Sequence, residues 1–596
     1  MIGGKIVKKV KPDLNAVKRL LKIGGDKKTN VRLMVFFIVT IVTTLISPIL
    51  SYLSKLIIDM LSETYLLGNR QLFWSIGKVV ISLLILTLLS FVFNSIKEME
   101  QIYINYDTTK KINTYIYGKL NRIKYECYEN PTTYDVITRV SANCPGIYSI
   151  LNSFITLAMA VVSTILYGFL LGSIRWYFIF LVLIPSILCV LGETKNMFER
   201  YFLDIGQTTD QRKLNYMHNL FRDKKSNKEI RAFHLLNTLI EKYESLRLKL
   251  YKQGMRLLMK QSFVSFSLLM FSKIGIFICL FIVCIAYMEG KASLGDISLV
   301  LSAGATFASS FNNIFSQVNN VTEKAIYLND WTSFEAMECE QYDSEQLQMV
   351  ETIKFHDIFY KYPDSESYAL RNINCEIKKG TTIALVGENG SGKTTFSKLV
   401  LGALTPSKGN ITVNNESLSN VLHAFREKLS YVPQNYGTFK MTLENNLKLA
   451  EPDINLDTYK LRFINFCDKL PKGYCTPLGN VYANGVDLSG GEWQRISIER
   501  ALIRNGVEVY IMDEPAASLD PIMESELYEH FTNELKGKTI IITSHRLGAC
   551  SLADYIYVFD HGEIVEEGSH EELMKLHGKY YEMYTAQRSL YERSTV

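Results

Sequence analysis

A glycine-rich segment in the second half of the chain has the residue types that hold phosphate groups. It has the sequence G-E-N-G-S-G-K-T over residues 387–394, between an apolar run typical of a strand (TTIALV) and one typical of a helix (TTFSKLVLGAL). Glycines allow backbone N–H groups to close around phosphate oxygens at a helix N-terminus, where the helix dipole favours negative charge. This pattern in this context predicts a P-loop that binds a nucleoside triphosphate.

The polar residues of this loop have separate expected roles. We expect Lys393 to reach the β- and γ-phosphates and Thr394 to ligate Mg²⁺. The residues predicted to contact the nucleotide along the loop are Gly387, Asn389, Gly390, Ser391, Gly392, Lys393, Thr394 and Thr395.

Two adjacent carboxylates, Asp513 and Glu514, end a downstream apolar stretch (VEVYIMDE) that is typical of a strand. A carboxylate at such a strand end, near a P-loop, is expected to be a second Mg²⁺ contact, which assigns that role to Asp513. Glu514 is then positioned to polarise an attacking water as a general base. Alternatively, the pair is an ordinary strand end with two solvated acids, and the upstream P-loop favours the catalytic interpretation.

The segment L-S-G-G-E at residues 488–492 lies between the P-loop and Asp513, and here the sequence resembles the ABC transporter family. The resemblance extends over residues 350–590 and implies ATP and Mg²⁺ as cofactors. It implies that Tyr362 stacks on adenine, that Gln434 acts in catalysis and Mg²⁺ binding, and that Asp520 lies in the D-loop beside the nucleotide. His545 matches the switch histidine of the family and is expected to act in catalysis.

The L-S-G-G-E segment also predicts a partner. Its residues Ser489, Gly490 and Gly491 are expected at a second helix N-terminus, which suits a γ-phosphate. In the family this segment completes the P-loop of the opposite subunit, so two halves are expected to meet face to face with ATP between them. Because every catalytic position matches the family consensus, a homodimer is the leading expectation, and a heterodimer with a degenerate half remains open.

The first half of the chain carries an excess of apolar residues before residue 320. A bilayer core needs about 20 apolar residues in helical form. Six segments qualify as spans: 31–53, 74–96, 147–171, 176–192, 263–288 and 294–315. The alternative, buried helices of a large soluble core, is disfavoured because stretches such as IGIFICLFIVCIAYM have no polar face.

The connections between these segments predict their orientation. Short loops join the first and second, third and fourth, and fifth and sixth segments, whereas two long Lys- and Arg-rich connections separate the pairs. Positive charge favours the cytoplasmic side, so we expect the basic N-terminus and the ATPase domain to be cytoplasmic in a plasma-membrane protein. The turns at 130–135 and 222–227 are then expected to be coupling helices that contact the ATPase domain.

These patterns predict a multi-domain protein in which an all-α polytopic membrane domain of six long helices precedes an α/β P-loop ATPase domain. The latter is expected to have an antiparallel β subdomain and a helical subdomain. The expected boundaries are a basic segment with an elbow helix at 1–30, the transmembrane domain at 31–335, a linker at 336–349 and the nucleotide-binding domain at 350–596. The membrane half resembles exporters of the type IV architecture.

Other features limit the function. The net charge of +5 is too small to indicate nucleic-acid binding, and the ten cysteines show no metal-ligand spacing. The architecture favours ATP-driven export of a peptide, lipid or other amphipathic compound by alternating access, with an importer or an ATP-gated channel or regulator as alternatives.

Polar side chains inside spans are costly and therefore mark a possible substrate path. Lys273, in the fifth span, is hypothesised to face a cavity and favour anionic or carbonyl-rich cargo, although it could instead snorkel to the interface. Further polar candidates are Asn94, Asn312, Asn313 and Gln317.

Overall fold

The computed structural model describes residues 14–593 apart from 68–70, 144–147, 341–346, 364, 457–463, 465, 483, 517, 518, 520, 534 and 545–552. The chain divides into two compact units. We call Met1–Leu120 with Val136–Ala336 the helical unit, and Asn121–Asp135 with Met337–Val596 the sheet unit. The stretch Asn121–Asp135 lies inside the membrane half of the sequence but clusters with the sheet unit.

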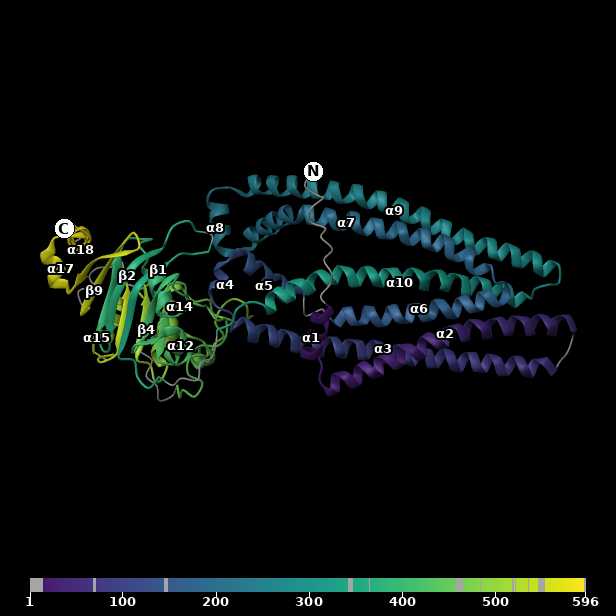
Figure 1. The fold of residues 1–596 in the computed structure, drawn as a ribbon, viewed down its shortest axis with the longest axis horizontal. Coiled ribbons are helices and arrows are strands. Elements are labelled where there is room, and N and C mark those ends of the chain that lie inside the picture. Colours follow the sequence, from purple (N-terminus) through teal and green to yellow (C-terminus); the bar gives the residue numbers. More distant parts are fainter. Residues whose placement is uncertain are drawn as a thin grey trace. The chain divides into compact units, whose positions relative to one another are not determined.

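Six long helices dominate the described part of the helical unit, as the sequence predicts (Figure 1). They are α2 (Lys27–Leu67), α3 (Gln71–Leu120), α6 (Tyr148–Ile174), α7 (Phe178–Arg222), α9 (Leu236–Met288) and α10 (Leu294–Glu335). Three shorter helices accompany them: α1 (Leu14–Gly24), α5 (Pro131–Asn143), which begins in the sheet unit, and α8 (Lys224–Ala232). The long helices pack chiefly in pairs, α2 with α3, α6 with α10, and α7 with α9.

Five helices in the described part of the chain are long and apolar enough to cross a membrane. The apolar stretches lie within Lys27–Thr64, Trp74–Leu120, Ser149–Ile174, Leu236–Met288 and Leu294–Val321. In α7 the apolar stretch is limited to Phe178–Gly192, which at about 1.5 Å per residue is shorter than a bilayer core of about 30 Å.

Polar residues that follow the short apolar stretch of α7 find partners on α9. The Asn196 amide donates to Ser265 Oγ at 3.2 Å, and Glu199 forms an ion pair with Lys260 at 2.9 Å. The fourth predicted span is therefore a long helix whose part after Gly192 is stabilised by pairing with a neighbouring helix rather than by apolar character.

The sheet unit contains a six-stranded sheet with the order β10-β9-β3-β8-β7-β6. Its strands are β3 (Thr382–Gly387), β6 (Leu429–Val432), β7 (Val509–Asp513), β8 (Thr539–Thr543), β9 (Tyr555–Asp560) and β10 (Glu563–Gly568). All neighbouring pairs are parallel except β9 with β10. An antiparallel sheet with the order β2-β1-β4-β5 contains β1 (Thr352–Tyr360), β2 (Leu370–Lys378), β4 (Lys408–Val413) and β5 (Glu416–Ser417).

The two sheets share a core around α11 (Lys393–Val400). Phe396 of this helix stacks on Phe355 of the antiparallel sheet, with ring centroids 4.5 Å apart, and lies 5.4 Å from Phe559 of the parallel sheet. The other described α-helices of the unit are α4 (Glu126–Glu129), α12 (Leu418–Glu427), α13 (Leu443–Lys448), α14 (Gly490–Ile503), α15 (Pro521–Asn533), α17 (His570–Leu576) and α18 (Lys579–Arg593).

A separate apolar cluster holds α13 and α14 together. It includes Leu443, Leu447, Trp493 and Ile496, all buried. The predicted antiparallel and helical subdomains are therefore both present.

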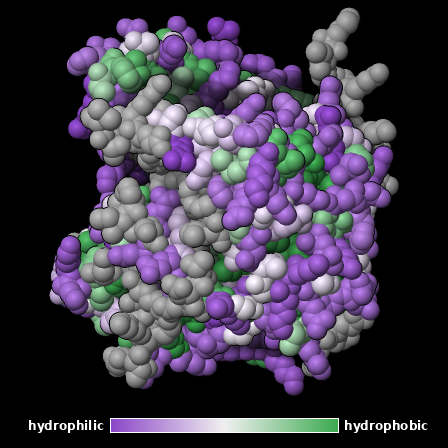
Figure 2. Space-filling view, turned by 90° about the vertical axis from the view of Figure 1, so that its left-hand side faces the viewer, coloured by the Kyte–Doolittle hydropathy of each residue, from purple (hydrophilic) through white to green (hydrophobic). Residues whose placement is uncertain are grey.

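The face of the molecule in Figure 2 is mainly hydrophilic with small apolar patches, whereas the long helices expose large apolar side chains such as Phe91, Phe169 and Phe281.

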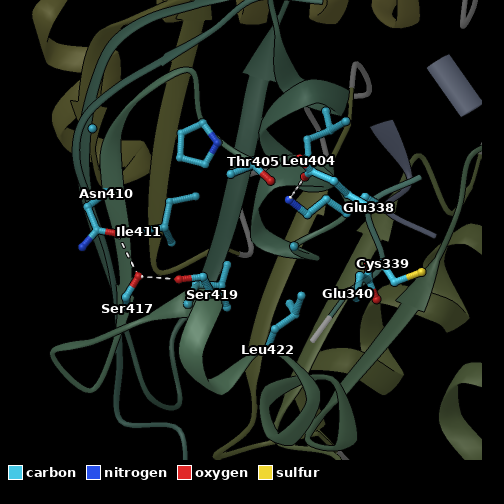
Figure 3. A pocket seen from close by; sticks show the side chains of 16 residues that line it. Glu338, Cys339, Glu340, Leu404, Thr405, Asn410, Ile411, Ser417, Ser419 and Leu422 are labelled. Carbon is cyan, nitrogen blue, oxygen red and sulfur yellow. Dashed lines mark hydrogen bonds and ion pairs between the residues drawn. The ribbon is translucent and has the colours of Figure 1, made fainter. Parts of the chain in front are cut away.

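A cavity of about 670 Å³ in the sheet unit lies between the segment Glu338–Glu340 and the region of β4 and α12 (Figure 3). Its acidic lining residues are already paired, because Glu338 contacts Lys124 and Glu340 contacts Arg426, each at 2.6 Å. None of its lining residues belongs to the P-loop.

Close packing of α7 on α9 generates a prediction about stability. A Cβ atom at Gly275 would lie 2.4 Å from the carbonyl oxygen of Leu181 and 3.2 Å from Pro185 Cγ. Gly275→Ala should therefore force the helices apart and cost about 1–3 kcal/mol. Gly254, on the same helix, has nothing within 4 Å of such a Cβ. Because alanine is a better helix former than glycine by about 1 kcal/mol, Gly254→Ala should be neutral or stabilising. Thermal unfolding of both variants in detergent measures this, and equal melting temperatures would contradict the packing argument.

Candidate nucleotide site

Four adjacent parallel strands bring the predicted site residues together. Strands β3, β8, β7 and β6 are neighbours, so their carboxyl ends meet at one edge of the sheet, where ligands bind in open α/β sheets. At that edge β3 ends with Gly387, β8 with Thr543 and β7 with Asp513, while Gln434 follows β6 by two residues.

The glycines of the P-loop have conformations that side chains would disturb. Gly387, Gly390 and Gly392 have φ of +153°, +82° and +110°. A Cβ atom at Gly387 would lie 2.3 Å from the Phe559 carbonyl oxygen, and one at Gly392 would lie 2.6 Å from Leu370 Cδ2. Gly392 is the N-cap of α11, which begins with the predicted nucleotide contacts Lys393, Thr394 and Thr395. Asn389 and Gly390 are exposed and Ser391 is buried, so the tip of the loop is open to a ligand.

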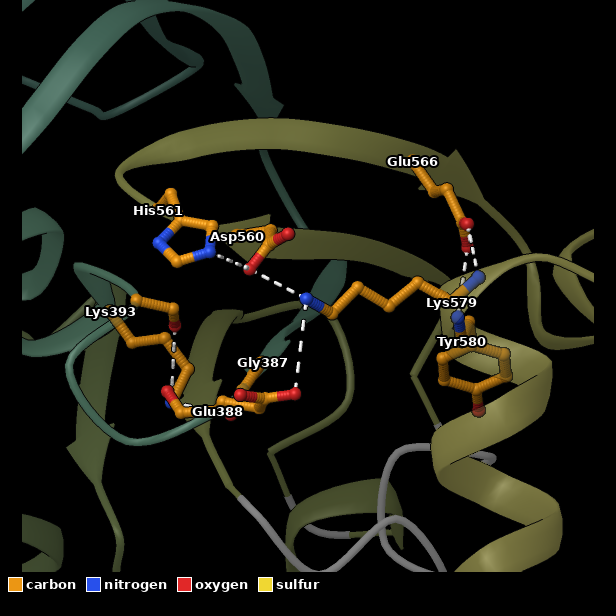
Figure 4. A network of polar contacts seen from close by, with 9 residues as sticks. Gly387, Glu388, Lys393, Asp560, His561, Glu566, Lys579 and Tyr580 are labelled. Atoms are coloured by element: carbon orange, nitrogen blue, oxygen red, sulfur yellow. Dashed lines mark hydrogen bonds and ion pairs between the residues drawn. The ribbon is translucent and has the colours of Figure 1, made fainter.

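The side chain of Lys393 folds back onto this loop (Figure 4). It is 5% exposed, and its Nζ donates to the carbonyl oxygens of Gly387 and Glu388 at 2.7 and 2.8 Å. Burial lowers the pKa of Lys393, against the opposing charges of Glu514 and Asp513. The ammonium group is therefore bound to the loop itself while the charges of both carboxylates act on it.

The start of α18 is tied to the same region (Figure 4). Lys579 Nζ lies 2.6 Å from Asp560 and 3.9 Å from Glu388 of the P-loop. The backbone N–H groups of Lys579 and Tyr580 donate to Glu566 at 2.5 and 3.0 Å. Helix α18 therefore supports strand β9, on which Gly387 packs.

Asp513 has the surroundings of a metal ligand. It is 1% exposed, Thr543 Oγ1 donates to its Oδ1, and its Oδ2 is buried without a hydrogen-bond partner among the described residues. Burial raises the pKa of Asp513, while the hydrogen bond from Thr543 acts in the opposite direction. A hard cation such as Mg²⁺ prefers oxygen ligands of this kind. The unpartnered carboxylate oxygen therefore fits a bound Mg²⁺.

Several hydrogen bonds fix the position of Glu514. Its φ is +52°, and its backbone N–H donates to the Thr543 carbonyl oxygen at 3.1 Å. Gln434 Nε2 donates to Glu514 Oε2 at 2.9 Å, and Gln494 Nε2 donates to the Glu514 carbonyl oxygen at 3.3 Å. The carboxylate is thereby directed beside Gln434 at the edge of the sheet, where a general base would be needed.

Ser489 lies at a helix N-terminus, as the sequence predicts. Ser489 is the N-cap of α14, whose first residues are Gly490 and Gly491, and it forms a reciprocal capping box with Glu492. Ser489 and Gly490 are exposed, and the Tyr436 hydroxyl donates to the Gly490 carbonyl oxygen at 2.6 Å. The Ser-x-x-Glu spacing is itself a sequence signal for this cap.

Tyr362 lies against the P-loop helix. Its hydroxyl is 3.2 Å from Thr395 Oγ1, and its ring centroid is 5.8 Å from Lys398 Nζ. Lys398 also forms an ion pair with Glu129 at 2.8 Å and lies 5.5 Å from the centroid of the Tyr125 ring. Lys398 thus contacts both Tyr362, the aromatic residue expected at adenine, and the segment around α4.

The segment 130–135 belongs to the sheet unit, and the contacts around it come from just before that turn. Besides the ion pair of Glu129, Glu126 Oε1 accepts from the Thr405 backbone N–H at 2.5 Å. The second predicted turn, 222–227, contains Asp223, which caps α8 in the helical unit. Asp520 and His545 lie outside the described residues, so their roles stay predictions.

Comparisons with known proteins agree with this architecture. The family model described as ABC transporter transmembrane region matches residues 33–310, and the one described as ABC transporter matches residues 370–517. Together they cover more than two thirds of the chain. The chain is 28% identical over 485 residues to the subtilin transport ATP-binding protein of Bacillus subtilis, covering 79% of each.

Two further similarities extend over most of the chain. The nisin transport ATP-binding protein of Lactococcus lactis subsp. lactis is 24% identical over 80% of this chain and 82% of its own length. The fold is similar, with a TM-score of 0.72 and 19% identity, to the structure of a bacterial Atm1-family ABC exporter with ATP bound, covering 94% of this chain and 98% of that one. The chain belongs to the ABC transporter family and is a half-transporter of the type IV exporter architecture, with one transmembrane region and one ATP-binding domain in a single polypeptide.

Proposed function

We propose that two copies of this chain form two Mg²⁺-dependent ATPase sites at their interface and use them to export a peptide. The protein is an ATP-driven exporter that resides in a membrane, and the proposal concerns its assembly, chemistry, orientation and cargo. The observation that carries the peptide assignment is similarity along about four fifths of the chain to transporters of subtilin and nisin, which are peptides. Such coverage includes membrane helices as well as the ATPase domain.

The dimeric site is supported by the open tip of α14. Exposed Ser489, with Gly490 and Gly491 behind it, presents a helix N-terminus that suits a γ-phosphate. Each chain supplies one such tip and one P-loop, so a symmetric pair completes two sites. ATP then binds between the subunits, and loss of its γ-phosphate removes contacts to the partner's helix tip.

Within each site the side chains have distinct tasks. Lys393 moves from its own loop carbonyls to the β- and γ-phosphates, and Tyr362 stacks on the adenine. Asp513, Thr394 and Gln434 hold Mg²⁺, which when bound neutralises charge on the phosphate oxygens. Glu514, oriented by Gln434 and Thr543, accepts a proton from the attacking water, with Asp520 and His545 assigned to the same site.

We propose that a movement caused by nucleotide binding reaches the membrane helices through α11 and α4. Lys398 lies five residues after Lys393 on α11 and joins the ring of Tyr362 to the carboxylate of Glu129. A shift of α11 on nucleotide binding would therefore move α4, which leads into the membrane helices. The basic N-terminal segment and long basic connections support placing the ATPase domain in the cytoplasm, with the spans in the plasma membrane.

The peptide and hydrolysis assignments predict that proteoliposomes with the ATPase domain outside will accumulate short amphipathic peptides when ATP and Mg²⁺ are supplied. Glu514→Gln should retain ATP binding but slow turnover by about 10²–10⁴-fold, because a general base contributes that much. Peptide uptake and phosphate release are measured in parallel. Active ATPase without uptake of any peptide would contradict the peptide assignment, and normal turnover of Glu514→Gln would contradict the role of the base.

The dimeric site predicts complementation between two inactive variants. Lys393→Ala removes the P-loop cation, and Ser489→Arg blocks the helix tip. A mixed dimer still has one complete site, so mixing the variants before reconstitution should restore up to about a quarter of native turnover, since half of the dimers are mixed. ATPase activity of each variant alone provides the control. No recovery in verified mixed dimers would mean that the site does not form between subunits.

The proposed contact through α4 predicts that Lys398→Glu and Glu129→Lys each lower the ratio of peptide-stimulated to basal ATPase activity several-fold. The double charge swap should recover most of that ratio, because the ion pair re-forms with reversed sign. Lys354→Glu is a matched control, since Lys354 pairs with Glu376 at 3.4 Å on the antiparallel sheet and surface pairs contribute only about 0–1 kcal/mol. Additive losses in the double variant would exclude this route.

A further inference from the structure

A cavity of about 340 Å³ lies in the helical unit among α2, α3, α6 and α10. Most of its lining residues carry hydroxyl, carboxamide or ammonium groups, although all four helices belong to candidate membrane spans. Polar side chains are costly in a hydrocarbon surrounding and are retained there chiefly for function. This cavity is therefore a candidate binding site in the membrane half.

The hydroxyl groups around the cavity are held by the helices themselves. Thr44 Oγ1 donates to the Thr40 carbonyl oxygen at 2.7 Å within α2, and the hydroxyls of Ser163 and Ser310 lie 2.8 Å apart, joining α6 to α10. Thr44 and one hydroxyl of the Ser163–Ser310 pair therefore use their protons within the protein, and the hydroxyl oxygens keep acceptor capacity. The walls can thus accept hydrogen bonds from a ligand without rearrangement.

Three stronger polar groups in the cavity have no such partner. The side chains of Asn94, Lys97 and Asn313 line the cavity and form no hydrogen bond or ion pair with a described residue. Asn94 and Lys97 lie one turn apart on α3, and Asn313 lies on α10. Asn94 and Asn313 are exposed and Lys97 is half-buried, so an ammonium group and two carboxamides are available to a ligand.

We propose that this cavity binds a carboxylate of the exported peptide together with its neighbouring amide groups. Lys97 pairs with the carboxylate, and Asn94 and Asn313 hydrogen-bond to the peptide backbone, each carboxamide being both donor and acceptor. The hydroxyl oxygens accept backbone N–H groups. The volume is near the lower end of ligand pockets, which span about 300–1,000 Å³, so the cavity takes a few residues rather than a whole peptide. This inference rests on the proposed peptide export.

The lysine singled out by sequence is a different one. Lys273 is exposed on α9 and is not among the residues that line this cavity, whereas the sequence candidates Asn94 and Asn313 are. Lys97 lies just beyond the predicted second span, 74–96, and for that reason did not stand out. Lys273 is therefore a matched control: a lysine of another membrane helix, outside the cavity.

The test uses an N-acetylated alanine–leucine peptide in three forms: with a free C-terminal carboxylate, with a C-terminal carboxamide, and as the carboxamide with one internal aspartate. ATPase stimulation is measured with the full-length protein in phosphatidylcholine liposomes. The native protein should be half-maximally stimulated by the free-acid form at several-fold lower concentration than by the carboxamide. The aspartate form shows whether a side-chain carboxylate serves as well as the terminal one.

Lys97→Met should bring the acid and carboxamide forms to nearly equal half-maximal concentrations, Lys97→Arg should keep the preference, and Lys273→Met should behave like the native protein. Equal stimulation by both forms in the native protein, or a preference that survives in Lys97→Met, would overturn this inference while leaving peptide export intact. Lack of stimulation by every peptide would overturn both. Lys97-dependent stimulation by phosphatidylglycerol without peptide would assign the cavity to a lipid headgroup and overturn the peptide proposal.

Discussion

Two buried, opposite charges at one edge of the parallel sheet are the constraint on which the sheet unit depends. Lys393 is 5% exposed and bonds only to oxygens of its own loop, while Asp513 is 1% exposed and has one carboxylate oxygen without a partner among the described residues. Charges buried in this way are destabilising unless they are complemented. A nucleotide phosphate with its cation complements both at once, so ligand binding should stabilise this edge as well as supply the reaction.

The same edge explains why one helix can connect chemistry to a distant segment. Helix α11 begins at the phosphate site with Lys393 and, five residues later, presents Lys398 to Glu129 and to the ring of Tyr362. Its middle is fixed by Phe396, which packs against both sheets. A short helix packed in this way moves as a rigid body, so a displacement at Lys393 would also displace Lys398. This is the physical basis of the proposed route through α4.

The helical unit follows another constraint, because polar groups within a bilayer must find partners inside the protein. Hydroxyls such as Thr44 satisfy it within their own helix, and Ser163 with Ser310 satisfies it between helices. The part of α7 just after its apolar stretch satisfies it by pairing Asn196 and Glu199 with α9. The side chains of Asn94, Lys97 and Asn313 have no such partner among the described residues, and they line one cavity.

The sequence by itself determined the features that arise from local chemistry. Glycines with positive φ at the P-loop, an apolar strand that ends in Asp513 and Glu514, and a cap at Ser489 are properties of a few consecutive residues, so their spacing predicts them. Long apolar runs similarly predict six long helices, because a span is recognised by length and hydropathy. The sequence also carried the roles of Asp520 and His545, which remain predictions.

Only the tertiary structure decided which residues meet. Strand order places β6 beside β7, and this neighbour relation brings Gln434 to Glu514 across 80 residues of sequence. The ion pair of Glu129 with Lys398 joins residues 269 apart, and the polar cavity draws its walls from four helices. No local pattern encodes such contacts, since they depend on how whole helices and strands pack, and packing is a property of the complete chain.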